Sequence, residues 1–236
     1  MDYIFISDID DTLIGNDQSL RRFNNVISSL REKFFLVYSS GRFKGSLLSV
    51  VAEHNLLQSD AIICNVGTEI YYAPSWKEDK EWEKMLEENW KKEEITTILK
   101  DFPVEEQPYD KKFTASYYVK AESIVGKIKK ALKDFEVKVI HTKGHLLDII
   151  PEKAGKGNAA KFLQKSKNLP TVCSGDSEND IDMLIKCDSS ILVGNAEKTV
   201  KEQLSTNKKV YQAKAEYALG VLEGLRSFQV IEEKNE

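Results

Sequence analysis

The sequence lacks any long hydrophobic run. No apolar stretch approaches the roughly 20 residues that a helix needs to span a bilayer, and the N-terminus lacks the basic and then apolar segments of a secretory signal. Blocks of basic residues are also missing, and the formal net charge of the 236 residues is -4. We therefore expect neither a membrane nor a nucleic acid as a partner.

Cysteine and histidine are scarce, with three residues of each. No two cysteines form a C-x-x-C pair, and Cys64 and Cys173 lie in apolar runs that predict buried strands. We expect all three thiols to be small buried groups in a reducing, cytoplasmic setting. His141 and His145 have the spacing of a helical metal pair, but the β-rich residues around them argue against a helix. We therefore expect them to be strand or surface residues.

What is present is ordinary for a soluble globular protein, with 41% hydrophobic and 31% charged residues. Short apolar runs alternate with amphipathic stretches. We predict strands at residues 3–6, 34–38 and 60–64, and helices from Asp17 as N-cap to about 32 and from 42 to about 57. The order strand, helix, strand, helix, strand predicts an α/β fold with a Rossmann-like, doubly wound parallel sheet.

The character of the chain changes near Ala73-Pro74. Residues 76–101 are rich in Trp, Lys and Glu and predict amphipathic helix. Strands are expected at 113–119, 137–141 and 146–150, the last two joined by a turn at 143–144, and a helix at 123–135. The first pattern resumes after residue 155. We therefore predict a core from residues 1–74 and 155–236 and a smaller inserted α+β cap from residues 75–154.

The first strand runs directly into Asp8, Asp10 and Asp11. Ligands of open α/β sheets bind at the carboxyl ends of the strands, and side chains two residues apart in an extended segment share a face. Asp8 and Asp10 can therefore converge on one atom. Two such carboxylates repel each other unless a cation neutralises them, so they could form a Mg²⁺ site or divide into a nucleophile and a general acid. Both interpretations can hold together, and an ordinary turn after a strand is the alternative.

Three further stretches lie at the same predicted edge. Ser39-Ser40-Gly41-Arg42 follows the second strand and opens a helix, which suits an anion or an ordinary cap. Lys156 lies between two glycines where the core pattern resumes. Gly175-Asp176-Ser177-Glu178-Asn179-Asp180 places more acids after another apolar strand. Together they supply the groups that move a phosphoryl group.

These four stretches resemble the signature motifs of the haloacid dehalogenase-like (HAD) phosphatases: Asp-x-Asp-x-Thr at 8–12, hydrophobic-Ser-Ser-Gly-Arg at 38–42, Lys156, and Gly-Asp-x-x-x-Asp at 175–180. The inserted segment is similar to the α/β cap of the Cof-like subgroup. Within that group the chain most resembles the sucrose-phosphate phosphatases over almost its whole length, for example at Val66-Gly67-Thr68-Glu69 and Leu147-Asp148-Ile149-Ile150-Pro151.

The resemblance implies a phosphatase that forms an aspartyl-phosphate. It makes Asp8 the nucleophile and Asp10 the general acid and base. Mg²⁺ is implied at Asp8, the backbone carbonyl of Asp10, and Asp176. The residues implied around them are the phosphate-binding set Ser40, Gly41, Lys156 and Asn179, the supporting residues Asp180 and Arg42, and the candidate sugar contacts Gln107, Lys112 and Tyr117.

The implied substrate is a small phosphorylated sugar, with sucrose 6-phosphate favoured. The alternatives are another sugar phosphate, such as a mannosyl- or glucosyl-3-phosphoglycerate or a hexose phosphate, and a catalytically silent partner of a glycosyltransferase. A binding role beside a sugar-phosphate synthase is compatible with activity. All the residues to which the resemblance gives a catalytic role are present, which argues against a catalytically silent protein.

Overall fold

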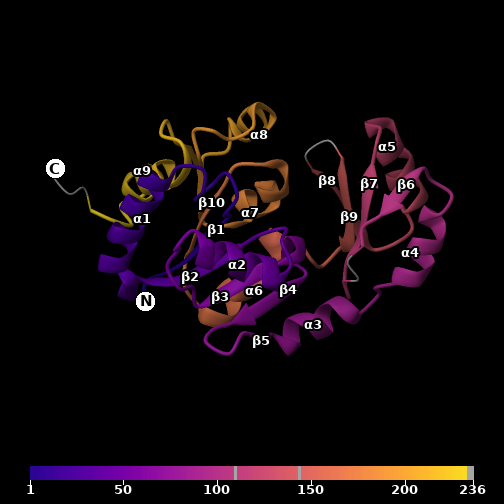
Figure 1. The fold of residues 1–236 in the computed structure, drawn as a ribbon, viewed down its shortest axis with the longest axis horizontal. Helices are drawn as coiled ribbons and strands as arrows, with labels where there is room; N and C mark the ends of the chain where they lie inside the picture. The colour runs from indigo at the N-terminus through magenta and orange to yellow at the C-terminus, as the bar shows by residue number, and fades with distance from the viewer. Residues whose placement is uncertain (109–110, 143–144, 233–236) are drawn as a thin grey trace.

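The computed structural model describes residues 1–108, 111–142 and 145–232, so the turn predicted at 143–144 lies outside the described residues. The described chain forms an α/β core with a smaller α+β unit, the cap, at one side (Figure 1). The first and the last of the described residues, 1 and 232, belong to the core. The cap carries its own sheet, which faces the core across the region where the proposed chemistry lies.

One sheet of eight strands organises the core, in the order β12-β11-β10-β1-β2-β3-β4-β5. The strands from β12 to β3 pair in parallel, and β4 and β5 add an antiparallel edge. The predicted α/β class is confirmed. Parallel pairing brings the carboxyl ends of β1, β2 and β10 to one edge of the sheet. The core strands are β1 (Tyr3–Ser7), β2 (Phe34–Ser39), β3 (Ala61–Cys64), β4 (Glu69–Tyr72), β5 (Lys77–Glu78), β10 (Thr171–Gly175), β11 (Ser189–Leu192) and β12 (Val210–Gln212).

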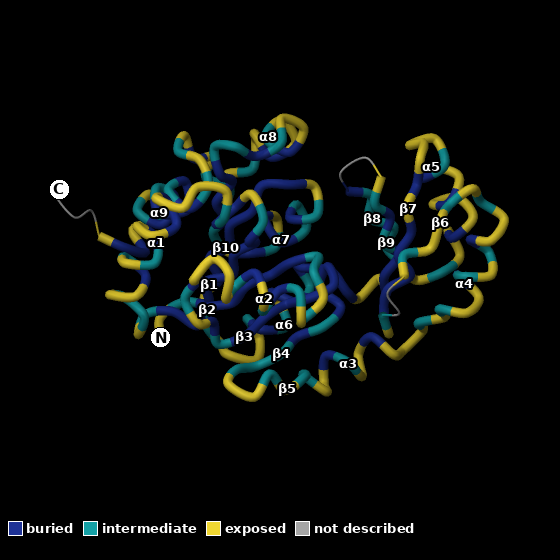
Figure 2. The backbone as a smooth tube through the Cα atoms, in the orientation of Figure 1, coloured by how far each residue is buried: buried dark blue, intermediate teal, exposed yellow. Residues whose placement is uncertain are grey.

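Helices cover the core sheet, with α1 packed against α9 and α6 against α7. Ile4, Phe5 and Ile6 of β1 are fully buried, as expected of a parallel strand covered on both faces, and Figure 2 shows the centre of the core in the colour of buried residues. No helix in the described ranges has the length and apolar character to cross a bilayer. The core helices are α1 (Asp17–Ser29), α2 (Lys44–Glu53), α6 (Lys156–Lys167), α7 (Ile181–Lys186), α8 (Lys198–Leu204) and α9 (Tyr217–Ser227).

The N-cap of helix α1 lies one residue earlier than predicted. Asn16 is the N-cap, with an extended backbone and a side chain that accepts a hydrogen bond from the backbone N–H of Ser19. The prediction of Asp17 as N-cap was wrong. Asp17 is the first helical residue, where its negative charge favours the positive end of the helix dipole.

The cap sheet has the order β6-β7-β9-β8, with every pair antiparallel. Its hydrophobic cluster joins the sheet to two helices and includes Ile95, Val125, Ile128 and Leu147. The predicted elements 113–119, 123–135, 137–141 and 146–150 are present with shifted ends, and β6 was not predicted. The cap elements are α4 (Lys92–Leu99), β6 (Val104–Glu106), β7 (Ala115–Val119), α5 (Glu122–Ala131), β8 (Val137–Thr142) and β9 (Leu146–Pro151).

Residues 77–87, which the predicted cap includes, pack with the core in the structure. Strand β5 extends the core sheet, and Trp82 of α3 (Lys80–Glu87) is buried in the core cluster, with its ring 5.2 Å from that of Phe162. The amphipathic helix expected over 76–101 forms as two helices, with a break between Glu87 and Lys92. We propose that the division between core and cap falls at this break.

The scarce residues lie largely where the sequence predicts. Cys64 is in β3, Cys173 is in β10, and all three cysteines are buried free thiols. His141 lies in β8, and His145 is not in a helix. The helical metal-pair alternative for these two histidines is therefore excluded.

Candidate active site

Asp8 lies at the carboxyl end of β1, in the middle of the sheet. Its backbone N–H donates to the carbonyl of Ser174 at 3.0 Å, which continues the β1–β10 pairing by one residue. The Ser7 hydroxyl donates to the Asp8 carbonyl at 2.7 Å. These bonds fix the backbone, and the Asp8 side chain is buried at the base of a cavity.

Lys156, the first residue of α6, contacts Asp8 although the two residues are 148 positions apart in the sequence. Its Nζ lies 2.6 Å from Asp8 Oδ1, 2.7 Å from Asp180 Oδ1 and 3.1 Å from Asn179 Oδ1, and the side chain is fully buried. Burial alone would lower the pKa of Lys156, but the carboxylates of Asp180 and Asp8 outweigh it and raise that pKa above its usual value. Lys156 is therefore a permanent cation beside Asp8.

The backbone before Lys156 is packed against a second glycine. Gly67 has a φ of 90°, and a Cβ on it would lie 2.2 Å from the carbonyl carbon of Gly155. No side chain fits there without moving the segment that carries Lys156. Gly67 therefore sets the position of the start of α6.

We expect Gly67→Ala to destabilise the fold by about 2–4 kcal/mol, from backbone strain and overpacking together. Gly126→Ala is the matched control, because Gly126 lies in α5 with open space around its Cβ position; it should stabilise by about 0.5–1 kcal/mol. Urea unfolding measures both. Equal stabilities of the two variants would contradict the packing of Gly67 on Gly155.

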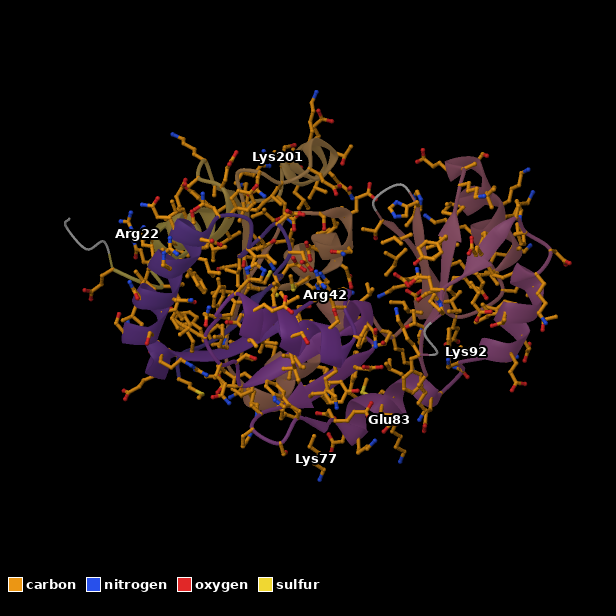
Figure 3. The ribbon with its side chains drawn as sticks, in the orientation of Figure 1. Arg22, Arg42, Lys77, Glu83, Lys92 and Lys201 are labelled. Atoms are coloured by element: carbon orange, nitrogen blue, oxygen red, sulfur yellow. The ribbon has the colours of Figure 1, made fainter. Side chains whose placement is uncertain are left out.

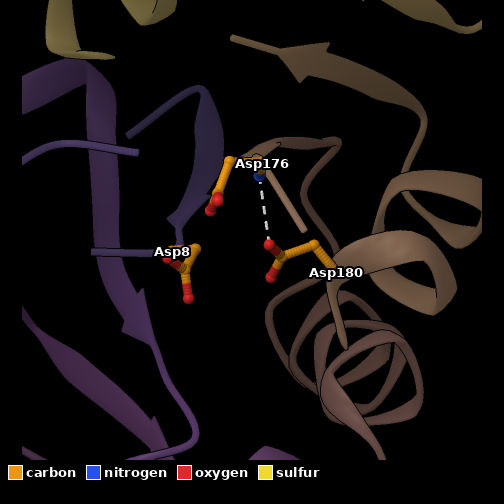
Figure 4. Close-up of side chains that lie close together, drawn as sticks. All are labelled: Asp8, Asp176 and Asp180. Carbon is orange, nitrogen blue, oxygen red and sulfur yellow. Dashed lines mark hydrogen bonds between the residues drawn. The ribbon is translucent and has the colours of Figure 1, made fainter. Parts of the chain in front are cut away.

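Three buried carboxylates gather at this edge: Asp8, Asp176 and Asp180 each offer an oxygen within 4.8 Å of the others (Figure 4). Both oxygens of Asp180 are used by the chain itself. Its Oδ1 accepts from Lys156, and its Oδ2 accepts from the N–H groups of Asp176 and Ser177 at 3.1 and 3.2 Å. Asp180 therefore holds Lys156 and the loop after β10.

Asp8 and Asp176 each have one carboxylate oxygen that is available to bind a cation. Asp8 Oδ1 accepts from Lys156, and Asp176 Oδ1 accepts from the Thr12 hydroxyl at 2.9 Å. Within the described part of the chain, the Oδ2 atom of each residue has no hydrogen-bond donor. Burial, with the charge of Asp180 added, raises the pKa of Asp176 to about 7 and that of Asp8 well above its usual value. One ammonium does not neutralise three acids, so the site suits a divalent cation.

The Asp10 carboxyl points to Arg42, which Figure 3 labels on the side of the core that faces the cap. Arg42 Nε and a terminal nitrogen each donate to one oxygen of Asp10 at 2.8 Å, a two-bond pairing that raises the pKa of Arg42. Arg42 thus fixes the direction of this carboxyl. It also donates its backbone N–H to the Ser40 hydroxyl at 3.1 Å.

A cavity of about 550 Å³ opens above these residues, between the core and the cap. The core contributes Asp8, Asp10, Ser40, Gly41 and Asn179 to its wall. The structure therefore brings the predicted nucleophile, the predicted general acid and three of the four predicted phosphate-binding residues to one space, whereas Lys156 is fully buried and is not on the cavity wall. The described cap residues on its wall are Gln107, Lys111, Thr142, Leu146 and Asp148.

Of the three candidate sugar contacts, Gln107 alone lines this cavity. Lys112 is turned away and forms ion pairs with Glu83 at 2.8 Å and Glu87 at 2.5 Å. Tyr117 is buried among the cap's hydrophobic residues. Because neighbouring residues of a strand face opposite ways, Tyr118 and not Tyr117 lies on the exposed face of β7.

Lys111 and Asp148 line the cavity but were not predicted. They meet at one hydroxyl, since Lys111 Nζ lies 3.2 Å from Ser116 Oγ and Ser116 donates to Asp148. Asp148 carries a signal in the sequence, as a lone acid that alternates with the buried Leu147 and Ile149 of β9. Lys111 and Lys112 lie outside any strand, so no periodicity distinguishes them.

The sequence profile of the family described as Sucrose-6F-phosphate phosphohydrolase matches residues 1–229. Sucrose-phosphatase 1 of Nicotiana tabacum is 31% identical over 251 residues, 96% of this chain and 59% of that protein. The chain thus spans about three fifths of the plant relatives it matches. Mannosylfructose-phosphate phosphatase of Agrobacterium fabrum is 27% identical over 233 residues, 93% of this chain and 94% of that protein.

A solved structure points to the same group of proteins as these sequences. The sucrose-phosphatase of a Synechocystis species, in complex with sucrose and phosphate, superposes with a TM-score of 0.91 at 26% identity, covering 97% of this chain and 98% of that one. The profile match, the similar sequences and the shared fold agree with the four motifs gathered at the sheet edge. The chain belongs to the sucrose-6F-phosphate phosphohydrolase family and has a HAD-like fold.

Proposed function

We propose that this chain is a Mg²⁺-dependent phosphatase that hydrolyses a sugar phosphate, with sucrose 6-phosphate preferred, through an aspartyl-phosphate on Asp8. One observation carries the proposal: the buried carboxyl of Asp8 lies 2.6 Å from a permanent cation at the base of a cavity with a core wall and a cap wall. That arrangement presents a nucleophile and charge stabilisation to one phosphoryl group.

In the first step, an oxygen of Asp8 attacks phosphorus and the bond from phosphorus to the sugar oxygen breaks. Asp10, released from Arg42 and in its acid form, gives its proton to that leaving oxygen. In the second step, the Asp10 carboxylate takes a proton from water as the water oxygen attacks phosphorus, and the bond to Asp8 breaks. Inorganic phosphate and the free sugar leave, and both carboxyl groups return to their starting states.

The transferred phosphoryl group carries negative charge on its equatorial oxygens. Ser40, Gly41 and Asn179 line the cavity, where they can bind those oxygens, and Lys156 lies 2.6 Å from the Asp8 carboxyl that would receive the phosphoryl group. Asp8, Asp176 and the backbone carbonyl of Asp10 would hold Mg²⁺. A bound Mg²⁺ would neutralise the paired acids and stabilise charge on the phosphoryl oxygens.

We expect the affinity for Mg²⁺ to fall about tenfold from pH 8 to pH 6. The pKa of Asp176 is raised to about 7 in the metal-free protein, so this carboxyl takes up a proton over that interval and ceases to be a ligand. Calorimetric titration of the metal-free protein measures the affinity at each pH. Unchanged affinity across the interval would remove Asp176 from the metal site.

The cap side of the cavity supports a sugar as the leaving group. Gln107, Lys111 and Asp148 present an amide, an ammonium and a carboxylate, which are groups that bind sugar hydroxyls. The structural relative from Synechocystis binds sucrose together with phosphate. Mannosylfructose phosphate is the second candidate, because the relative named for it matches this chain over nearly its full length.

Phosphate release should be measured with Mg²⁺ on sucrose 6-phosphate, mannosylfructose phosphate, mannosyl-3-phosphoglycerate, glucose 6-phosphate and para-nitrophenyl phosphate. We expect the highest kcat/KM on sucrose 6-phosphate, since kcat/KM is the quantity that ranks competing substrates. Hydrolysis of para-nitrophenyl phosphate with sucrose 6-phosphate ignored would keep the chemistry and reject the substrate. No hydrolysis of any ester would favour the catalytically silent alternative.

We also propose a location and a partner for the chain. The three buried free thiols support a cytoplasmic location. We propose a sugar-phosphate synthase as a partner, because it would supply the substrate directly. Co-purification of the two proteins from the host would test that association.

A further inference from the structure

Residues 11–15, which directly follow Asp10, are called the catalytic loop here. Asn195 joins this loop to helix α9. It lies in the loop after β11, and its side-chain amide is hydrogen-bonded at both ends. The Nδ2 group donates to the backbone carbonyl of Asp11 at 2.6 Å, and Oδ1 accepts from the backbone N–H of Tyr217 at 2.8 Å. One side chain therefore connects the residue after Asp10 to the first residue of α9.

Both of its backbone partners have left-handed conformations, which residues other than glycine adopt at a cost. Asp11 has a φ of 59° and Tyr217 a φ of 52°. The Tyr217 ring also lies against Gly15 at the other end of the catalytic loop, where a Cβ would be 2.2 Å from Tyr217 Cε1. Residues 11–15 are thus held against α9 at two points.

The inner side of the loop is fixed in a different way. The carbonyl of Ile9 accepts from the N–H groups of Thr12, Leu13 and Ile14 at 3.3, 3.0 and 3.0 Å, and the Thr12 hydroxyl donates to Asp176. None of these bonds involves the Asp11 carbonyl. The hydrogen bond from Asn195 therefore holds the carbonyl of Asp11, the residue directly after Asp10, from the side of the loop that faces α9.

We propose that Asn195 is a positioning residue for the general acid. It holds Asp11 in its left-handed conformation and so fixes the backbone from which the Asp10 carboxyl extends, while Arg42 fixes the carboxyl itself. Without Asn195 the Asp11 peptide relaxes, and Asp10 no longer reaches the leaving oxygen. This inference rests on the proposed function, because it needs Asp10 to protonate a leaving group.

The test compares two leaving groups. A sugar alkoxide needs a proton as it departs, whereas para-nitrophenolate leaves without one. With saturating Mg²⁺, Asn195→Ala should lower kcat/KM on sucrose 6-phosphate, or on the best sugar phosphate found, by about 10- to 100-fold. The same variant should lose less than about threefold in kcat/KM on para-nitrophenyl phosphate, because that ratio depends on the steps up to the release of nitrophenolate and not on the later attack of water.

A second variant separates the two hydrogen bonds. Asn195→Asp keeps an acceptor for the Tyr217 N–H but has no donor for the Asp11 carbonyl, so it should show the same leaving-group selectivity. Asn24→Ala is the matched control, since Asn24 also donates to a distant backbone carbonyl, that of Asn55 at 2.9 Å, but this bond starts from α1 and does not involve residues 11–15. It should leave both substrates unchanged.

Three results would overturn the inference. Equal losses on both substrates, with a lowered melting temperature, would show general damage to the fold. An Asn195→Asp variant as active as the unmodified chain would show that the Tyr217 bond is the one that matters. Failure of the unmodified chain to hydrolyse either ester would reject the proposed function itself, and this inference with it.

Discussion

Asp8→Asn should lower the turnover of the best sugar phosphate by about 10⁴-fold or more, the order of loss that removal of a nucleophile causes in other enzymes. An amide oxygen does not displace the sugar oxygen at phosphorus, and no other carboxylate among the described residues lies as close to Lys156 with an oxygen in reserve. Phosphate release with Mg²⁺ present measures the loss. A variant that keeps more than a few per cent of the activity would remove Asp8 from the nucleophile role.

The same substitution should not lower stability. The pKa of Asp8 is raised by burial and by its acidic neighbours, so at neutral pH the charged form is disfavoured in the fold, and an uncharged amide of the same shape relieves that repulsion. Asp60→Asn is the matched control. Asp60 accepts from Arg31 and from the Leu36 N–H, both at 2.7 Å and far from the cavity, so its loss should cost about 1–2 kcal/mol and no activity.

Lys156→Met should cause the second large effect, on activity and stability together. Removal of the cation leaves Asp8 and Asp180 buried without their charged partner, and breaking such a pair costs about 3–5 kcal/mol. Loss of the charge beside the phosphoryl group should lower kcat by about 10²- to 10³-fold. Urea unfolding in chelator and phosphate release with Mg²⁺ measure the two losses.

Lys138→Met provides the comparison for Lys156. Lys138 lies on β8, donates to the carbonyl of Ala154 at 2.7 Å and is 3.7 Å from Asp182, with part of its side chain exposed. Its loss should cost about 1 kcal/mol or less and should leave the chemical step intact. Similar stability losses for the two lysines would contradict the account of Lys156 as the counter-charge of the acid cluster.

The core could be predicted because its sequence signals are local. Buried parallel strands are continuous apolar runs, and each polar motif follows such a strand directly, so Asp8, Ser40 and Asp176 could be placed at one edge before the structure was known. The position of Lys156 depends on contacts that no local pattern contains. Its support by Gly67, and its bond to Asp180, join segments that are far apart in the sequence.

The cap was harder to predict because one residue of error reverses which way a strand side chain faces. Tyr117 and Tyr118 differ by one position, yet one is buried under the cap helices and the other is exposed. The choice of Lys112 over Lys111 failed for another reason. Lys112 is held by Glu83 and Glu87 of α3, a helix that the sequence pattern did not separate from its neighbour.

The central claim, an aspartyl-phosphate on Asp8, has one direct test. An Asp10→Asn variant, which lacks the base that activates water, should be mixed with Mg²⁺ and para-nitrophenyl phosphate, whose leaving group departs without a proton from Asp10, quenched in acid and analysed by peptide mass spectrometry. We expect the mass of one added phosphoryl group on the peptide that contains Asp8, lost on treatment with hydroxylamine. Turnover without any adduct, or an adduct on a peptide that lacks Asp8, would contradict the account.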